Sequence, residues 1–150
     1  GPTETPSGGE TPSGGETPSG GETPTEPIVF YEGSYDDKFT DNGQYGAQVK
    51  FDLTKPIPAG TKVKITMKAT CAKALTDFMP RVIDSTWGPA WVGGWDAGQV
   101  IIPLEADVAK DIEAEFTTEK EAVYLCICSN EKSFGEPALK LENIKVVEVK

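Results

Sequence analysis

All three tryptophans of the chain, Trp87, Trp91 and Trp95, fall within nine residues of a glycine-rich stretch. The Gly-Pro and Gly-Gly pairs between them argue against a helix, so a spacing of four places the indoles on one face of an extended segment. A flat indole covers the apolar C–H face of a pyranose ring while nearby polar groups bond to its hydroxyls. The segment therefore predicts a sugar-binding surface; the alternative is a small aromatic core that anchors the loop.

Four further side chains are candidates for the same site. Tyr124 lies on the strand face opposite Leu125, either in a concave sheet face that holds a polysaccharide or under cover in a central strand. Arg81 is the only arginine, and its guanidinium offers a rigid fork for sugar hydroxyls or for an acid substituent; an ion pair at the rim is the alternative. Gln48 and Gln99 are weaker hydrogen-bonding candidates.

Catalytic and metal-binding chemistry is restricted by the composition. The chain has no histidine, which removes Ser-His-Asp and Cys-His catalysis and His-ligated zinc. Glycoside hydrolysis needs only two carboxylates at a defined separation, so a small hydrolase stays open, although no motif marks an acid–base pair. We expect no required cofactor, but Glu32 on the first strand and Glu142 or Asn143 near the last could supply oxygens to a structural calcium.

Residues 1–27 differ in kind from the rest of the chain. They repeat ETPSGG three times and carry five of the 24 acidic residues, without any basic or aromatic side chain. Lacking apolar groups, they cannot offset the entropy of ordering, so we predict a disordered linker at 1–27 and one domain at 28–150.

The charge of the domain bears on its partners. Residues 28–150 hold 19 acidic and 14 basic side chains, half of the overall net charge of −10. This composition lacks the basic stripe needed for nucleic acid, and no apolar run is long enough for membrane insertion. The domain is close enough to neutral that charge attraction explains a ligand poorly, which favours a neutral polysaccharide held by aromatic faces.

Alternation with a period of two predicts an all-β domain. The clearest strands are 47–53 and 63–71, separated by a proline- and glycine-containing break that indicates a hairpin-like return. Further strands are expected at 28–32, 78–84, 99–104, 111–116, 122–128 and 138–149. About eight short strands separated by turn residues predict a β-sandwich of the jelly-roll type, built from two antiparallel sheets.

The three cysteines are expected to be free. Cys126 and Cys128 are two apart on one strand, which is poor geometry for a mutual disulfide, and Cys71 belongs to another core face. Unpaired, buried thiols in a secreted protein indicate an anaerobic setting.

Two stretches resemble a known family. The run Ala138 to Val149 looks like the closing strand of β-sandwich carbohydrate-binding modules attached to xylanases and related glycoside hydrolases, and Ile57 to Thr66 is similar to their turn and following strand. The ETPSGG repeats look like the tethers of secreted bacterial polysaccharide-degrading enzymes.

The resemblance implies a non-catalytic module that binds a β-linked plant cell-wall polysaccharide and targets a covalently linked catalytic domain to it. Xylan is favoured over mannan, xyloglucan and β-glucan, and the location is expected to be extracellular, secreted or cell-surface attached, in an anaerobic bacterium. A structural or protein-binding β-sandwich of a cell-surface or cohesin-like protein is the alternative, in which the tryptophans would bury against a partner protein.

Overall fold

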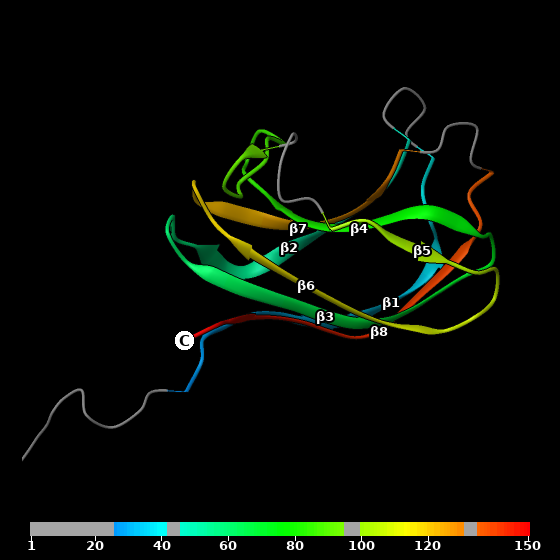
Figure 1. Cartoon of the computed structure of the whole chain (residues 1–150), viewed down its shortest axis with the longest axis horizontal. Coiled ribbons are helices and arrows are strands. Elements are labelled where there is room, and N and C mark those ends of the chain that lie inside the picture. Colours follow the sequence, from blue (N-terminus) through cyan, green and yellow to red (C-terminus); the bar gives the residue numbers. More distant parts are fainter. Residues whose placement is uncertain (1–25, 42–45, 95–99, 131–134) are drawn as a thin grey trace, which may run out of the picture.

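The computed structural model describes residues 26–41, 46–94, 100–130 and 135–150. Its eight strands are β1 (Val29–Lys38), β2 (Ala47–Ile57), β3 (Lys62–Cys71), β4 (Leu75–Ile83), β5 (Ile102–Leu104), β6 (Lys110–Thr117), β7 (Ala122–Ser129) and β8 (Ala138–Glu148). They form two four-stranded sheets, ordered β1-β8-β3-β6 and β2-β7-β4-β5, which face each other as two layers (Figure 1). This strand order is that of a jelly roll, and the predicted all-β sandwich is confirmed.

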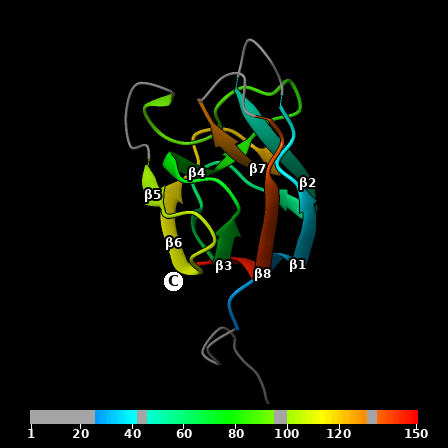
Figure 2. The ribbon, with the colours of Figure 1, turned by 90° about the vertical axis from the view of Figure 1, so that its right-hand side faces the viewer.

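Every strand pairing in the two sheets is antiparallel. Seen along the sandwich, β1 and β2 lie at one edge and β5 and β6 at the other (Figure 2). At the first edge, Tyr31 and Tyr35 of β1 pack against Phe51 of β2, each with a ring-centroid separation of 5.6 Å. These aromatic contacts close the edge by joining a strand of one layer to a strand of the other.

The expected hairpin between the second and third strands is wrong, because the chain crosses there from one sheet to the other. The buried Thr118 fixes the crossing: its hydroxyl donates to the Pro58 carbonyl at 2.6 Å and accepts from the Thr61 amide at 2.9 Å. The other expected strands lie at their predicted places, although β1 runs on to Lys38 and β5 is shorter than expected.

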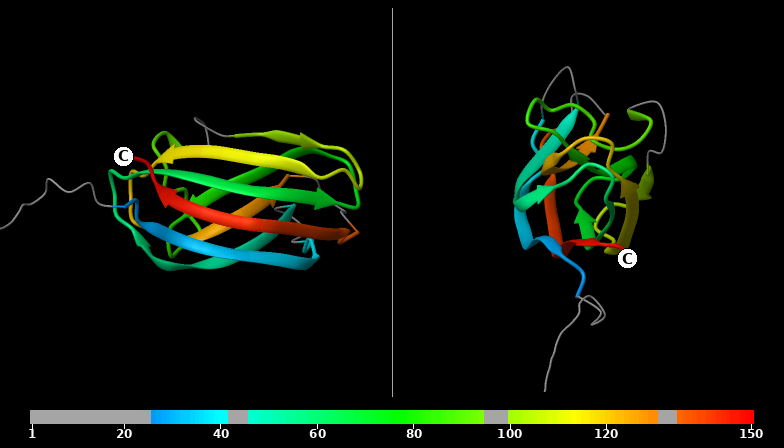
Figure 3. Two further views of the ribbon diagram at one scale, coloured as in Figure 1. Left: turned by 90° about the horizontal axis from the view of Figure 1, so that it is seen from below. Right: turned by 90° about the vertical axis from the view of Figure 1, so that its left-hand side faces the viewer.

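The apolar positions of the alternating pattern fill the space between the sheets. Val63 and Ile65 of β3 are fully buried, as are Leu125 and Ile127 of β7 in the opposite layer. Burying such a side chain stabilises the fold by roughly 1.5–3 kcal/mol. The sheet β1-β8-β3-β6 is seen from its outer side in Figure 3, with its strands side by side along the long axis of the domain. The core therefore fixes which face of each strand points inward and which points to the outside of the sandwich.

All three cysteines are free and buried, as expected. In denaturant we predict that Cys71, Cys126 and Cys128 all react with an excess of a chromogenic thiol reagent. In native buffer the reaction should be at least about tenfold slower, because access to a buried thiol requires local unfolding. An intact, non-reduced protein whose mass is lower by a pair of hydrogens would contradict this prediction.

Candidate functional site

The outer face of the β2-β7-β4-β5 sheet carries a groove of about 1000 Å³. Its floor is built from side chains that the strand register places in rows. Lys50 of β2, Cys126 of β7 and Arg81 of β4 form one row, and Gln48 and Cys128 belong to the next. All five line the groove, because they alternate with the residues that face the core.

Residues outside the strands also line the groove. Residues 84–94, which follow β4, stand over one end and contribute Trp87 to the lining. Thr40, which follows β1, and Asn130, which follows β7, also line the groove. The groove thus has a floor of strands and walls of loops.

Trp87 and Tyr124 form an aromatic pair at the groove. Their ring centroids are 6.5 Å apart and the ring planes are inclined by 39°. Trp87 is 45% exposed, whereas Tyr124 is half-buried. The Lys50 ammonium lies 4.0 Å from the Tyr124 centroid and 5.3 Å from that of Trp87, so cation–π attraction ties the two rings together. The exposed part of the indole is available to stack on a flat apolar ring.

The turn that presents Trp87 is held by Asp84. Trp87 has a φ of 67°, in the left-handed region that is unfavourable for residues other than glycine. Asp84 Oδ1 accepts hydrogen bonds from the amide and hydroxyl of Thr86, both at 2.8 Å, and from the Gly88 amide at 2.9 Å. These bonds, the Thr86 hydroxyl first, lower the pKa of Asp84 from 3.8 to about 2. The carboxylate therefore stabilises an otherwise unfavourable backbone conformation.

Arg81 lies in the floor of the groove rather than at its rim. The residue is 4% exposed, its Nη2 donates to Met79 Sδ at 2.6 Å, and its guanidinium carbon is 5.6 Å from the centroid of the Trp91 ring. Burial lowers the pKa of Arg81 from its usual value. A guanidinium remains charged under such a shift, so it is a partly desolvated cation that faces the groove.

Cys126 and Cys128 lie side by side in the floor, with their Sγ atoms 3.3 Å apart. Both face away from Leu125, as the alternation predicts. The hydrogen bond that they share raises the pKa of Cys126, and burial raises it further. The same hydrogen bond lowers the pKa of Cys128. Cys126 thus stays protonated at neutral pH, and both sulfurs are small groups between the longer side chains.

Trp91 does not share the face of Trp87, which corrects the expectation drawn from a spacing of four. It is 2% exposed, its ring centroid is 5.7 Å from that of Phe116, and its Nε1 donates to the Gly94 carbonyl at 2.5 Å. The left-handed φ at Trp87 turns the chain, so the two indoles diverge. Trp91 is therefore part of an aromatic core that anchors the loop, which was the alternative to a sugar-binding surface. Its ring has no exposed face for a ligand.

Of the predicted residues, Gln48, Arg81 and Trp87 line the groove, and Tyr124 contacts Trp87 beside it. Trp95 and Gln99 lie outside the described residues. Lys50, which contacts both aromatic rings, was missed by the sequence reasoning. The available signal was its place between Val49 and Phe51, which puts it on the same strand face as Gln48.

The two carboxylates considered for calcium lie on the other sheet. Glu32 pairs with Lys145 at 3.4 Å, and Glu142 is in register with Lys68 of β3. In the described part of the chain, no group of three or more His, Cys, Asp or Glu side chains could hold a metal ion. The geometry gives no support to calcium at Glu32 and Glu142, and that site stays a prediction.

No helix of the described residues has the length and hydrophobicity to cross a membrane.

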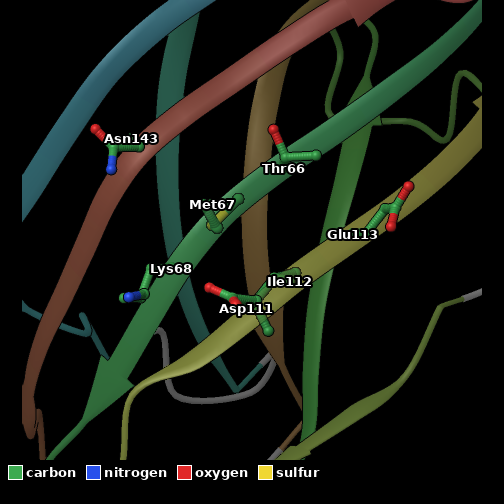
Figure 4. Close-up of a pocket in the computed structure, with 7 residues that line it drawn as sticks. All are labelled: Thr66, Met67, Lys68, Asp111, Ile112, Glu113 and Asn143. Carbon is green, nitrogen blue, oxygen red and sulfur yellow. The ribbon is translucent and has the colours of Figure 1, made fainter.

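A second, smaller hollow of about 460 Å³ lies over β3, β6 and β8 (Figure 4). Its polar rim comes from Thr66, Lys68, Asp111, Glu113 and Asn143. The described residues that line it include no aromatic ring, so it offers no flat apolar surface. The groove on the opposite layer is the better candidate for a binding site.

No protein-family model matches the sequence, and no curated protein matches it significantly. Among solved structures, "BiXyn10A CBM1 APO" superimposes with a TM-score of 0.52 and 10% identity, covering 83% of this chain and 93% of that one. The second N-terminal cellulose-binding domain of Cellulomonas fimi β-1,4-glucanase C gives 0.47 and 11%, covering 87% and 89%. A carbohydrate-binding module from Cellvibrio mixtus lichenase 5A in complex with cellotriose gives 0.45 and 13%, covering 82% and 98%.

The structural neighbours are carbohydrate-binding modules, as the sequence resemblance indicated. At such low identity the first of these similarities establishes the fold alone: the described residues adopt a β-sandwich of the kind found in carbohydrate-binding modules.

The different environments of two tryptophans predict different effects on stability. Trp91→Ala should lower the free energy of unfolding by about 3–5 kcal/mol, because it leaves a cavity in the core. Trp87→Ala removes a largely exposed ring and should cost less than about 1 kcal/mol. Urea denaturation followed by circular dichroism measures both, and similar losses for the two variants would contradict the assignment.

The lowered pKa of Asp84 predicts a specific loss of stability in acid. A carboxyl group whose pKa is lower in the folded state stabilises the fold above its unfolded pKa, here 3.8, and loses this contribution as the pH falls through about 2. Between these values the free energy of unfolding should fall more steeply for the parent protein than for Asp84→Asn. Asp111→Asn, an exposed change on β6, is the matched control and should follow the parent protein.

Proposed function

We propose that residues 28–150 form a non-catalytic module that binds one chain of a β-linked plant cell-wall polysaccharide in the groove, with xylan as the favoured ligand. The observation that carries the proposal is the Trp87–Tyr124 pair beside Gln48 and Arg81 on the outer sheet face. The indole would cover the C–H face of one sugar ring. The Gln48 amide and the Arg81 guanidinium would bond to hydroxyls.

The size and lining of the groove support binding of an oligosaccharide stretch. Its volume of about 1000 Å³ is at the upper end of the range for small-molecule sites, roughly 300–1,000 Å³. The described residues that line it include no Asp or Glu. Hydrolysis of a glycoside needs a pair of carboxylates beside the scissile bond, so this lining favours binding over catalysis.

The positions of the first and last residues of the β-sandwich support a targeting role. The Glu148 amide donates to the Ile28 carbonyl at 2.8 Å, so the domain begins beside the place where β8 ends. Strands β1 and β8, at which the domain begins and ends, belong to the β1-β8-β3-β6 layer, opposite the layer that carries the groove (Figure 1). A catalytic domain covalently linked at either end would leave the groove open, and the link would raise its effective concentration at an insoluble substrate. An extracellular location follows from this role as part of the proposal.

Affinity gel electrophoresis on xylan, mannan, xyloglucan and β-glucan tests the proposal. We expect retardation on at least one glycan, and a loss of affinity of about tenfold or more in Trp87→Ala and in Tyr124→Ala, as for other central aromatic contacts. Val108→Ala, which changes an apolar residue of 48% exposure away from the groove, is the control and should bind as the parent protein does.

Absence of retardation on every glycan would refute polysaccharide binding. Capture of a protein partner by a chain that ignores all glycans would instead favour the protein-binding alternative.

A further inference from the structure

The charge at the groove is opposite in sign to that of the domain. Residues 28–150 carry more acidic than basic side chains. Among the described residues that line the groove, however, the two that are charged at neutral pH are Lys50 and Arg81, both cations. One of them is the only arginine of the chain. A ligand in the groove therefore meets positive charge on the surface of an acidic domain.

The two cations act on the same part of the groove. Lys50 and Arg81 are both in register with Cys126, one on each neighbouring strand. Strands lie roughly 4.8 Å apart, so their Cα atoms are about 10 Å from each other, with the short Cys126 side chain between them. The charges of Arg81 and Lys50 both act to lower the pKa of Cys126, against the larger effect of its hydrogen bond to Cys128. Their fields thus overlap at the floor.

The carboxylates nearest to the groove accept hydrogen bonds from neighbouring segments or are exposed to solvent. Asp77 accepts hydrogen bonds from the Ser129 hydroxyl at 2.6 Å and from the Asn130 amide at 2.8 Å, one on each oxygen. Asp84 is bound to the turn that holds Trp87. Asp52 lies one row further, in register with Tyr124, and is exposed to water that screens it. The charge of Asp77 acts on Arg81 and offsets part of its positive field. None of the three carboxylates lines the groove, however, so the charged side chains of its described lining are cations.

We infer that the groove binds a polysaccharide that carries carboxyl groups, a uronic-acid-bearing β-linked glycan, with the acid at Lys50 and Arg81 and an uncharged ring on Trp87. This inference rests on the proposed function and names the ligand class of that site. Hydrogen bonds between a guanidinium or ammonium and a carboxylate are roughly twice as strong as those between neutral groups. The fork of Arg81 suits a carboxylate in particular. The expectation of a neutral ligand, drawn from the total charge, is thereby revised.

The test compares two forms of one ligand. A β-xylan with glucuronic acid branches is used as such and after chemical reduction of its carboxyl groups to primary alcohols, which preserves the backbone and branching. Isothermal titration at low salt should give an affinity about tenfold higher for the acid form, and added salt should narrow the difference. Lys50→Met keeps the length and apolar character of the side-chain stem. It should bring the ratio of the affinity for the acid form to that for the reduced form closer to one. Lys145→Met, on the opposite sheet, is the control and should preserve that ratio.

The ratio separates recognition of the acid from a general effect on folding or stacking, because a loss of structure weakens both forms alike. Equal affinity for the acid and reduced forms would overturn the inference and leave polysaccharide binding intact. Binding to neither form, together with no retardation on the neutral glycans, would overturn the proposed function and the inference with it. Equally tight binding of polyglutamate would also overturn the inference, because charge without a sugar would then suffice.

The variant Arg81→Lys keeps the positive charge but loses the planar guanidinium. It should lower the affinity for the acid form more than the affinity for the reduced form.

Discussion

The register of β2, β7 and β4 is the constraint on which the candidate site depends. Leu125 and Ile127 are buried against the opposite layer, and their burial fixes which face of β7 points inward. Because side chains alternate with a period of two, a slip of one residue would carry the core residues to the outside and the site residues to the inside. The free energy of the core therefore holds Lys50, Cys126 and Arg81 in one row, although Lys50 and Arg81 are not part of the buried hydrophobic cluster.

The loop after β4 adds what the strands cannot supply. Trp87 lies on the turn after β4 and not on a strand, and its side chain lines the groove together with side chains of the sheet. This turn needs a left-handed φ at a bulky residue, and the charge-assisted hydrogen bonds to Asp84 offset that cost. Four residues later Trp91 returns to the core and fastens the loop to Phe116. One tryptophan is thus held in position by the other.

The sequence was informative wherever a residue's environment depended on its neighbours along the strand. Alternation predicted the strands, the sandwich, the free cysteines and the shared face of Tyr124 and Cys126. It failed where contacts between distant segments decided the outcome. The spacing of Trp87 and Trp91 could not reveal a turn stabilised by the Asp84 side chain. The break before Val63 resembled a hairpin because a crossing between layers uses the same turn residues. Lys50 was not singled out, because only the pairing of β2 with β7 brings its ammonium over the ring of Tyr124, which is in register with Asp52 two residues further along β2.

The net charge of the domain favours a neutral ligand, whereas the two cations of the groove favour an acidic one. The charges nearest to the ligand have the larger effect. At physiological ionic strength, interactions between exposed charges fall off over about 8 Å. Half of the net negative charge of the chain belongs to residues 1–27, and within the domain acids such as Glu113 and Glu115, which are paired with Lys64, lie on the opposite sheet. A ligand in the groove is close to Lys50 and Arg81, and solvent screens it from the acids of the opposite sheet. The partly desolvated guanidinium of Arg81 is screened least, so the groove can select for an acid that the domain as a whole would repel.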